Sequence, residues 1–210
     1  QRDICMHTIC GRNSTAVEKS RKQYGWDHME TDWRKVVANP EIDIIDINTP
    51  NDSHAEIAIA AAKAGKHILC EKPLAMNVKQ CRQMLQAVKK SKVTHMICHN
   101  YRRIPAIAQA KKMIKDGVLG ELRHYYARYA QSWLVDPKVP RLWRMQKQYA
   151  GSGAHGDINA HIIDLARFLV GEFDEVSGQM HTFIKQRPLP NNPKKMGRVS
   201  VDAAAQFIGR

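Results

Sequence analysis

The sequence lacks any long hydrophobic run. Its longest apolar stretch, residues 57–62, ends at Lys63, whereas a membrane-spanning helix needs about 20 consecutive apolar residues. The opening residues Gln1-Arg2-Asp3-Ile4 also lack the basic, apolar and small-residue regions of a secretory signal. We therefore expect a globular protein with no membrane partner.

Paired cysteines are missing as well. The five cysteines are odd in number, and none belongs to a C-x-x-C pair, so the sequence indicates neither a disulfide framework nor a zinc site. Most of them fall in or beside apolar strands, where a thiol behaves as a small hydrophobic side chain. We expect reduced thiols, no bound metal and a cytoplasmic location.

Acidic residues are scarce relative to basic ones. There are 20 Asp and Glu against 33 Lys and Arg, which gives a formal net charge of +13. A surface of this charge attracts phosphate groups, so nucleic-acid binding is one alternative. The basic residues are scattered, however, and no aromatic side chains alternate with them to form a stacking surface. We expect no nucleic-acid partner, and a small anionic ligand would account for part of the charge.

Apolar strands alternate with helices in the first half of the chain. Strands are expected over residues 4–10, 42–48, 67–70 and 93–98. This order is typical of a parallel sheet with helical crossovers. The helices between the strands are expected to begin at the N-cap residues Ser14, Asp32, Ser53 and Asn77, and a later helix is framed by Pro105 and Gly117.

The pattern changes near residue 120. Residues 122–133 predict one long aromatic-rich strand with no short crossover after it, and five prolines between residues 137 and 193 divide the rest into loops. We therefore predict two domains, a dinucleotide-binding domain over residues 1–120 and a second α/β domain over residues 121–210.

A phosphate-binding turn is absent from the start of this sheet. A doubly wound dinucleotide fold opens with a strand, a G-x-G-x-x-G turn and a helix, but Gly11 and Gly25 are isolated. We interpret residues 4–10 as the second strand, so the first strand and the loop lie outside the sequence and a dinucleotide would bind poorly without them. Arg12 and Asn13 follow this strand; an arginine there favours NADP, although it can equally stack on adenine or face solvent.

A lysine follows the third apolar strand. Glu71-Lys72-Pro73 comes directly after residues 67–70, and open α/β sheets bind ligands at the carboxyl ends of their strands. Asp157 and His161 are separated by one helical turn, so both side chains can face one cleft. Together these segments supply a lysine, a carboxylate and an imidazole.

Several segments, taken in order, resemble the Gfo/Idh/MocA family of NAD(P)-dependent oxidoreductases. They are residues 48–54, 71–73, 100–103, 143–144 and 153–171. The resemblance covers essentially the whole chain. It implies an α/β fold: a Rossmann-type doubly wound parallel sheet without its first strand and glycine-rich loop, then part of an α/β domain with an open, mainly antiparallel sheet that begins near residues 199–207. His155, Asn159 and the missing acid after Cys10 depart from the family pattern.

The resemblance implies hydride transfer between NAD or NADP and a secondary hydroxyl of a sugar, anhydrosugar or cyclitol. Such a reaction needs a base for the hydroxyl proton, and an imidazole with a pKa of about 6.5 suits this better than a lysine at about 10.4. His161 is then the base, Lys72 orients the hydroxyl and stabilises negative charge on its oxygen, and Asp157 binds substrate and tunes the imidazole. A histidine on an apolar helix face is, by itself, more often a core residue. Asp164 is expected to be structural and to pair with a neighbouring base.

The resemblance also implies a set of cofactor contacts. These residues are Arg12, Asn13, Thr49, Pro50, Asn51, His54, Glu71, Lys72, Asn100, Trp143 and Arg144. A Pro-Asn turn capped by Ser53 explains residues 49–54 equally well, and Trp143 suits a core anchor equally well. The family sheet implies a homo-oligomer, a dimer or tetramer, and residues 150–153 with 161–171 are most similar to members that make 3-keto sugars. The alternative function is a non-catalytic dinucleotide- or sugar-binding protein on the same fold.

Overall fold

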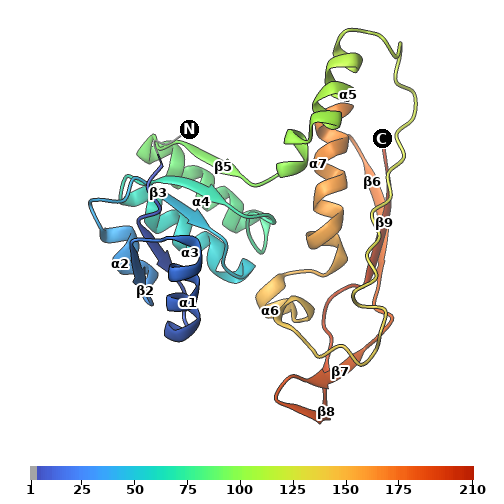
Figure 1. Ribbon diagram of the computed structural model, residues 1–210. Coiled ribbons are helices and arrows are strands. Elements are labelled where there is room, and N and C mark those ends of the chain that lie inside the picture. The colour runs from blue at the N-terminus through green and yellow to red at the C-terminus, as the bar shows by residue number, and fades with distance from the viewer. Residues whose placement is uncertain (1–3) are drawn as a thin grey trace. The chain divides into compact units, whose positions relative to one another are not determined.

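The protein is described as a computed structural model over residues 4–210. It divides into two compact units, whose elements are labelled in Figure 1. The first unit comprises the chain up to residue 49 with residues 53–71 and 78–97, and the second comprises residues 50–52, 72–77 and 98–210. The domain boundary that we predict near residue 120 falls within the second unit and stays a prediction.

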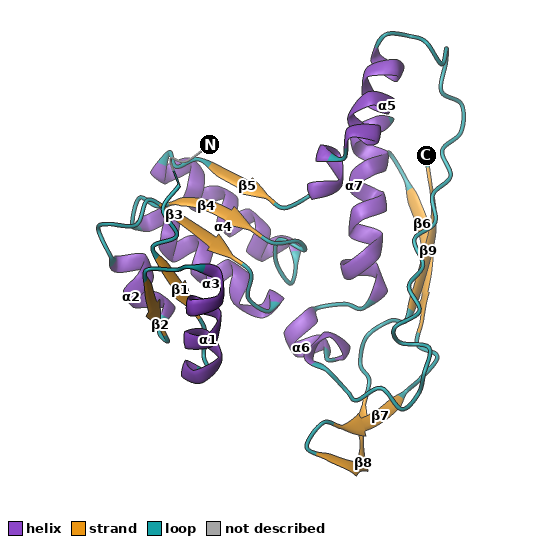
Figure 2. Ribbon diagram, viewed as in Figure 1, coloured by secondary structure: helices purple, strands orange, loops and turns teal. Residues whose placement is uncertain are grey.

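The first unit is built on parallel strands that alternate with helices. The strands are β1 (Thr8–Cys10), β2 (His28–Glu30), β3 (Ile44–Ile47), β4 (His67–Cys70) and β5 (His95–Ile97). β1 pairs with β2, and the other three form a sheet in the order β3-β4-β5, with every pairing parallel. The helices are α1 (Ser14–Tyr24), α2 (Trp33–Ala38), α3 (Asn51–Lys63) and α4 (Val78–Ser91). The predicted parallel sheet with helical crossovers is confirmed (Figure 2).

The core of this unit includes the sheet and an alanine-rich face of α3. Ile45 and Ile47 are buried on alternate positions of β3, as expected for a strand with one covered face. α3 buries Ile57 together with alanines at helical spacing, including Ala58 and Ala61. Small side chains on this face allow the helix to approach its neighbours closely.

Several boundaries differ from the sequence prediction. β2 was not predicted, because a three-residue strand is too short to show a hydrophobic period. Asn13, rather than Ser14, caps α1 and accepts a hydrogen bond from the Ala16 N–H at 3.0 Å. α3 begins at Asn51, so Ser53 lies inside the helix, and its hydroxyl donates to Thr49 Oγ1 at 2.7 Å.

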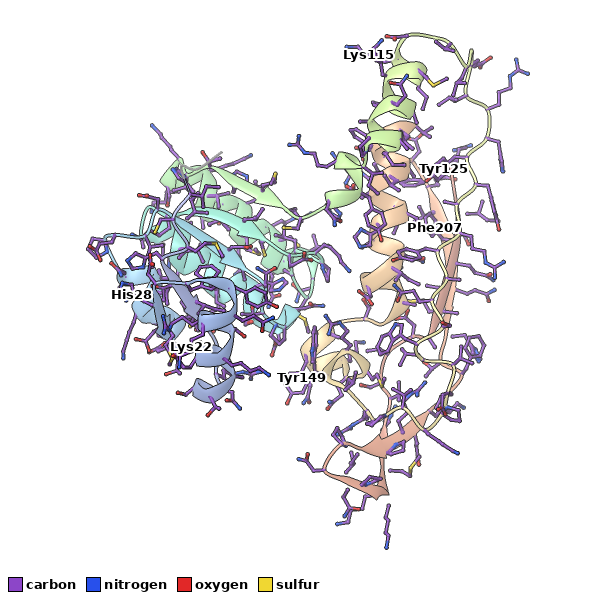
Figure 3. The ribbon with its side chains drawn as sticks, in the orientation of Figure 1. Lys22, His28, Lys115, Tyr125, Tyr149 and Phe207 are labelled. Carbon is purple, nitrogen blue, oxygen red and sulfur yellow. The ribbon has the colours of Figure 1, made fainter. Side chains whose placement is uncertain are left out.

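The second unit combines helices with antiparallel strand pairs. Its helices are α5 (Pro105–Lys115), α6 (Lys147–Ala150) and α7 (Ala160–Leu169), with 3₁₀ turns at Asn100–Arg103 and Trp143–Met145 and a π turn at His155–Asn159. Strand β6 (Val176–His181) pairs with β9 (Ala204–Gly209), and β7 (Gln186–Leu189) pairs with β8 (Asn192–Arg198), both antiparallel. The predicted antiparallel character is confirmed, although the strand expected over residues 199–207 begins only at Ala204. Phe207 of β9, labelled in Figure 3, contacts Phe173 edge-on, with ring centroids 5.8 Å apart.

The long strand predicted over residues 122–133 is wrong. This segment is loop in Figure 2, and Tyr125 is one of its side chains in Figure 3. Aromatic and β-branched residues favour a strand only where a partner strand accepts their backbone hydrogen bonds. Within residues 4–210 no strand pairs with this segment.

The helices of the described chain are short. None of them, within residues 4–210, is long and apolar enough to cross a membrane.

Candidate active site

Lys72 is held by the segment that carries Asp157. It follows β4, where the Glu71 N–H donates to the Ile47 carbonyl at 2.9 Å and so extends the ladder with β3. The Lys72 ammonium donates to Asp157 Oδ1 and to the Asp157 backbone carbonyl, both at 2.8 Å. The lysine side chain is only 15% exposed. Two acceptors on one residue fix the ammonium group in place.

Asp202 holds the start of the segment that carries Asp157. Its carboxylate accepts hydrogen bonds from the Gly153 N–H and the His155 N–H, each at 2.7 Å, and its backbone carbonyl accepts one from Ala154 at 3.1 Å. A Cβ at Gly153 would lie 1.8 Å from that carbonyl oxygen, so no larger residue fits. The glycine is therefore required by the close approach of two backbone segments.

Asp157 lies in the π turn and His161 in the first turn of α7. The sequence predicted one helical turn between them, and the structure forms that turn as a π turn that runs directly into α7. Such turns recur at functional sites, where they re-aim side chains. Asn159 anchors the turn, since its amide donates to the Ala205 carbonyl at 3.1 Å.

His161 is a buried imidazole with one unsatisfied nitrogen. The residue is 8% exposed, and among the described residues its Nδ1 has no hydrogen-bond partner. A buried polar atom in this state costs about 1–3 kcal/mol, which a hydroxyl of a bound ligand would recover. The unsatisfied nitrogen therefore makes His161 a candidate site residue.

The surroundings of His161 favour its neutral form. Burial lowers the pKa of the imidazole, and the positive charge of Lys72 and that of His99 lower it further. Asp157 and Asp164 act in the opposite direction without reversing the shift. At neutral pH the imidazole is therefore an unprotonated group that can accept a proton.

Asp164 pairs with a neighbouring base, as expected. Its carboxylate is 7% exposed and accepts two hydrogen bonds from Arg102, from Nε at 2.8 Å and from Nη2 at 2.6 Å. His99 Nδ1 lies 3.8 Å from the same carboxylate. The pair ties the 3₁₀ turn at Asn100–Arg103 to α7.

The cofactor contacts expected in the first unit lie after β1 and β3. Arg12 is exposed, and the Asn13 side chain is engaged in the α1 cap. Thr49 is exposed, whereas His54 is fully buried and its Nε2 hydrogen-bonds to the Thr49 carbonyl at 2.8 Å. His54 thus holds the turn that presents Thr49. Direct contact of these residues with a cofactor stays a prediction.

The remaining expected contacts belong to the second unit, apart from Glu71. The Asn51 amide donates to the Ala150 carbonyl at 2.9 Å, next to Pro50. Asn100 is exposed on its 3₁₀ turn, and the Arg144 guanidinium lies over the Trp143 ring at 4.4 Å. Their roles also stay predictions.

Three residues of the candidate site were not predicted from the sequence. Asp202 lies 47 and 49 residues from His155 and Gly153. Tyr101 and Tyr129, whose rings lie near that of His161, come from a turn and from the segment wrongly predicted as a strand. The signal for Asp202 was the glycine at position 153, which indicates a close approach without naming the partner. Tyr101 lies in the segment 100–103 that resembles the family, but no role was assigned to it there. Clusters of three or more potential metal ligands are not found in residues 4–210.

Family models match almost the whole chain. The model described as "Oxidoreductase family, NAD-binding Rossmann fold" matches residues 1–99, and the "GFO/IDH/MocA C-terminal domain" matches residues 107–210.

Curated relatives include sugar-metabolising enzymes. The chain is 48% identical over 181 residues to a levoglucosan dehydrogenase of Pseudarthrobacter phenanthrenivorans, which covers 86% of this chain and 46% of that protein. It is 33% identical over 142 residues to a 1,5-anhydro-D-fructose reductase of Ensifer adhaerens, covering 68% of this chain and 42% of the relative. The chain thus spans about half the length of the curated relatives it matches.

Solved structures agree with these matches. A levoglucosan dehydrogenase in complex with NADH and levoglucosan is 44% identical, with a TM-score of 0.94 over 98% of this chain and 54% of that one. An oxidoreductase domain protein from Kribbella flavida is 46% identical, with a TM-score of 0.93 over 98% of this chain and 55% of that one. The chain belongs to the Gfo/Idh/MocA family of oxidoreductases, whose N-terminal domain is an NAD-binding Rossmann fold.

Proposed function

We propose that the full-length protein is an NAD(P)-dependent dehydrogenase that oxidises a secondary hydroxyl of a sugar, anhydrosugar or cyclitol. The observation that carries the proposal is that the second unit contains both an anchored ammonium group, that of Lys72, and a neutral imidazole, that of His161. The Lys72 ammonium is fixed 2.8 Å from Asp157 Oδ1, and the buried His161 keeps an unpartnered Nδ1 among the described residues. The 48% identical relative supports an anhydrosugar such as levoglucosan as the substrate class.

Each member of the set has a separate task in the proposal. The substrate hydroxyl gives its proton to Nδ1 of His161, whose lowered pKa keeps that nitrogen free at neutral pH. The Lys72 ammonium donates to the substrate oxygen and stabilises the negative charge that develops there. Asp157 holds the ammonium and, as a nearby anion, stabilises the imidazolium once the proton has moved.

The side chains at the ends of β1 and β3 fit a dinucleotide. Arg12 and Thr49 are exposed there, and they offer a cation for phosphate and a hydroxyl for a ribose, at the sheet edge where such cofactors bind. When bound, the nicotinamide accepts the hydride from the carbinol carbon. The NADH complexes of the 44% identical enzyme favour NAD, although Arg12 by itself indicated NADP.

We also propose a cytoplasmic homo-oligomer. The support is exposed apolar surface on one face of the β6–β9 pair, where Val176 and Met180, at alternate positions of β6, are each more than half exposed. Apolar strand surface of this kind is typical of a face that a further subunit covers.

The experiment is an assay of the full-length protein with NAD and with NADP against levoglucosan, other sugars and inositols, following reduced nicotinamide by its absorbance. Activity on at least one of these substrates is expected. Lys72→Ala should lower turnover about 100-fold or more, while Lys79→Ala, an exposed lysine on α4, serves as the matched control. Absence of turnover with every substrate, together with measurable sugar binding by calorimetry, would support the non-catalytic alternative instead.

A further inference from the structure

The ring of Tyr101 covers one face of the His161 imidazole. The two ring centroids are 4.1 Å apart, and the planes differ by 13°, so the rings are stacked. The Tyr129 ring lies nearby, with its centroid 6.2 Å from that of His161 and 6.2 Å from that of Tyr101. His161 is thus enclosed by aromatic surface as well as by charged groups.

The stack is held from two directions. The hydroxyls of Tyr101 and Tyr129 are hydrogen-bonded at 2.9 Å, and the Gln131 amide donates to the Tyr129 hydroxyl at 3.1 Å. On the backbone side, the neighbouring Arg102 binds Asp164 through two hydrogen bonds, and Asp164 lies one helical turn after His161 on α7. These contacts hold the Tyr101 and His161 rings in place, so the nearly parallel arrangement of the two rings does not depend on a single side-chain rotamer.

The charged groups around His161 make its protonated form costly. Lys72 and His99 add positive charge, Asp157 and Asp164 add negative charge, and burial removes water. The face of an aromatic ring carries negative electrostatic potential, and it attracts a cation placed over it. The Tyr101 ring therefore interacts more favourably with the imidazolium than with the neutral imidazole.

We propose that Tyr101, held by Tyr129, is a positioning residue of the reaction: it fixes the plane of the His161 ring and stabilises the imidazolium that forms when the substrate proton arrives. The use of this contact in catalysis rests on the proposed dehydrogenase function. The contact itself does not, because it can be measured on the protein alone.

The test is a titration of the His161 ring by NMR in the full-length protein. Tyr101→Leu removes the aromatic face and should lower the pKa of His161 by about one pH unit. Tyr101→Phe keeps the ring and loses only the hydroxyl, so the pKa of His161 in this variant should stay close to its wild-type value. Tyr129→Phe breaks the same hydroxyl contact from the other side and should behave like Tyr101→Phe.

A fluorinated phenylalanine series at position 101 tests the electrostatic part without changing the shape of the ring. Each added fluorine weakens the negative face, so the pKa of His161 should fall stepwise from phenylalanine to the mono-, di- and trifluoro analogues. This series keeps the proposal testable if Tyr101→Leu does not fold. A pKa that is the same along the series would overturn the proposal.

Activity separates this proposal from the proposed function. If the protein oxidises sugars, the acid limb of the pH profile of kcat/KM should move to lower pH along the same series. If the protein oxidises none, the NMR titration still decides the role of Tyr101, and only the dehydrogenase function fails. A His161 pKa that falls along the series while the profile of an active enzyme stays fixed would overturn the catalytic use of the stack.

Discussion

Removing Arg102 should destabilise the protein more than neutralising its partner Asp164. The carboxylate of Asp164 is 7% exposed and accepts hydrogen bonds of 2.8 and 2.6 Å from Arg102, whose side chain is 41% exposed. Arg102→Ala leaves the carboxylate buried without its main partner, whereas Asp164→Asn leaves a guanidinium that can turn toward water. The asymmetry follows from which of the two charges is buried.

The magnitude can be worked from these surroundings. Breaking a buried ion pair by removing one partner costs about 3–5 kcal/mol. His99 Nδ1, 3.8 Å from the same carboxylate, offers partial compensation, and the exposure of Arg102 screens the original pair, so we expect about 2–4 kcal/mol for Arg102→Ala. Asp164→Asn should cost about 1–2 kcal/mol, because an amide oxygen still accepts a hydrogen bond.

The assay is equilibrium unfolding in urea, with the free energy of unfolding obtained from the midpoint and slope. The double variant should be more stable than Arg102→Ala, because it no longer buries a bare carboxylate. Arg103→Ala, an exposed neighbour, is the control and should stay within about 0.5 kcal/mol of the wild type. A smaller loss for Arg102→Ala than for Asp164→Asn would refute the reasoning.

Three further predictions concern the segment that carries His161. Asp202→Ala removes two short hydrogen bonds to the Gly153 and His155 N–H groups and should cost about 1–3 kcal/mol, with faster hydrogen exchange at both amides; unchanged exchange would contradict the anchoring role. Gly153→Ala should prevent the close approach of residue 153 to Asp202 and lower turnover, since the added Cβ would lie 1.8 Å from the Asp202 carbonyl oxygen. Ala154→Gly, the control, should keep both the close approach and the turnover. Folding lowers the pKa of His161, so between the folded-state pKa and about 6.5 the unfolded chain binds more protons than the folded one, and the free energy of unfolding should fall as the pH drops through this window. In denaturant melts at several pH values, His161→Gln should reduce this pH dependence of the unfolding free energy. The same pH dependence in the variant and the wild type would argue against a buried neutral imidazole.

Much of the fold could be predicted from the sequence because its strongest signals are local. β4 follows from the three consecutive apolar residues 68–70, and α5 follows from Pro105 at its first position and Gly117 past its end. The failure at residues 122–133 has the opposite cause. Strand formation depends on a partner that the local sequence does not identify.

The candidate site divides in the same way. The sequence associated Lys72 with Asp157 through a family resemblance, and the structure brings them into contact at 2.8 Å. The Tyr101 stack and the Asp202 anchor depend on contacts between distant segments, which no spacing in the chain reveals. The π turn around Asp157 also lacks a sequence signal, since it differs from an α-helix by a single residue per turn.

The most direct test of the account is the turnover of His161→Ala in the full-length protein, measured with and without added imidazole. If Nδ1 of His161 accepts the substrate proton, turnover should fall about 100-fold or more, cofactor affinity should stay near that of the wild type, and free imidazole should restore part of the rate. Turnover equal to that of the wild type, or a loss of cofactor binding that explains the whole decrease, would contradict the assignment of His161 as the base.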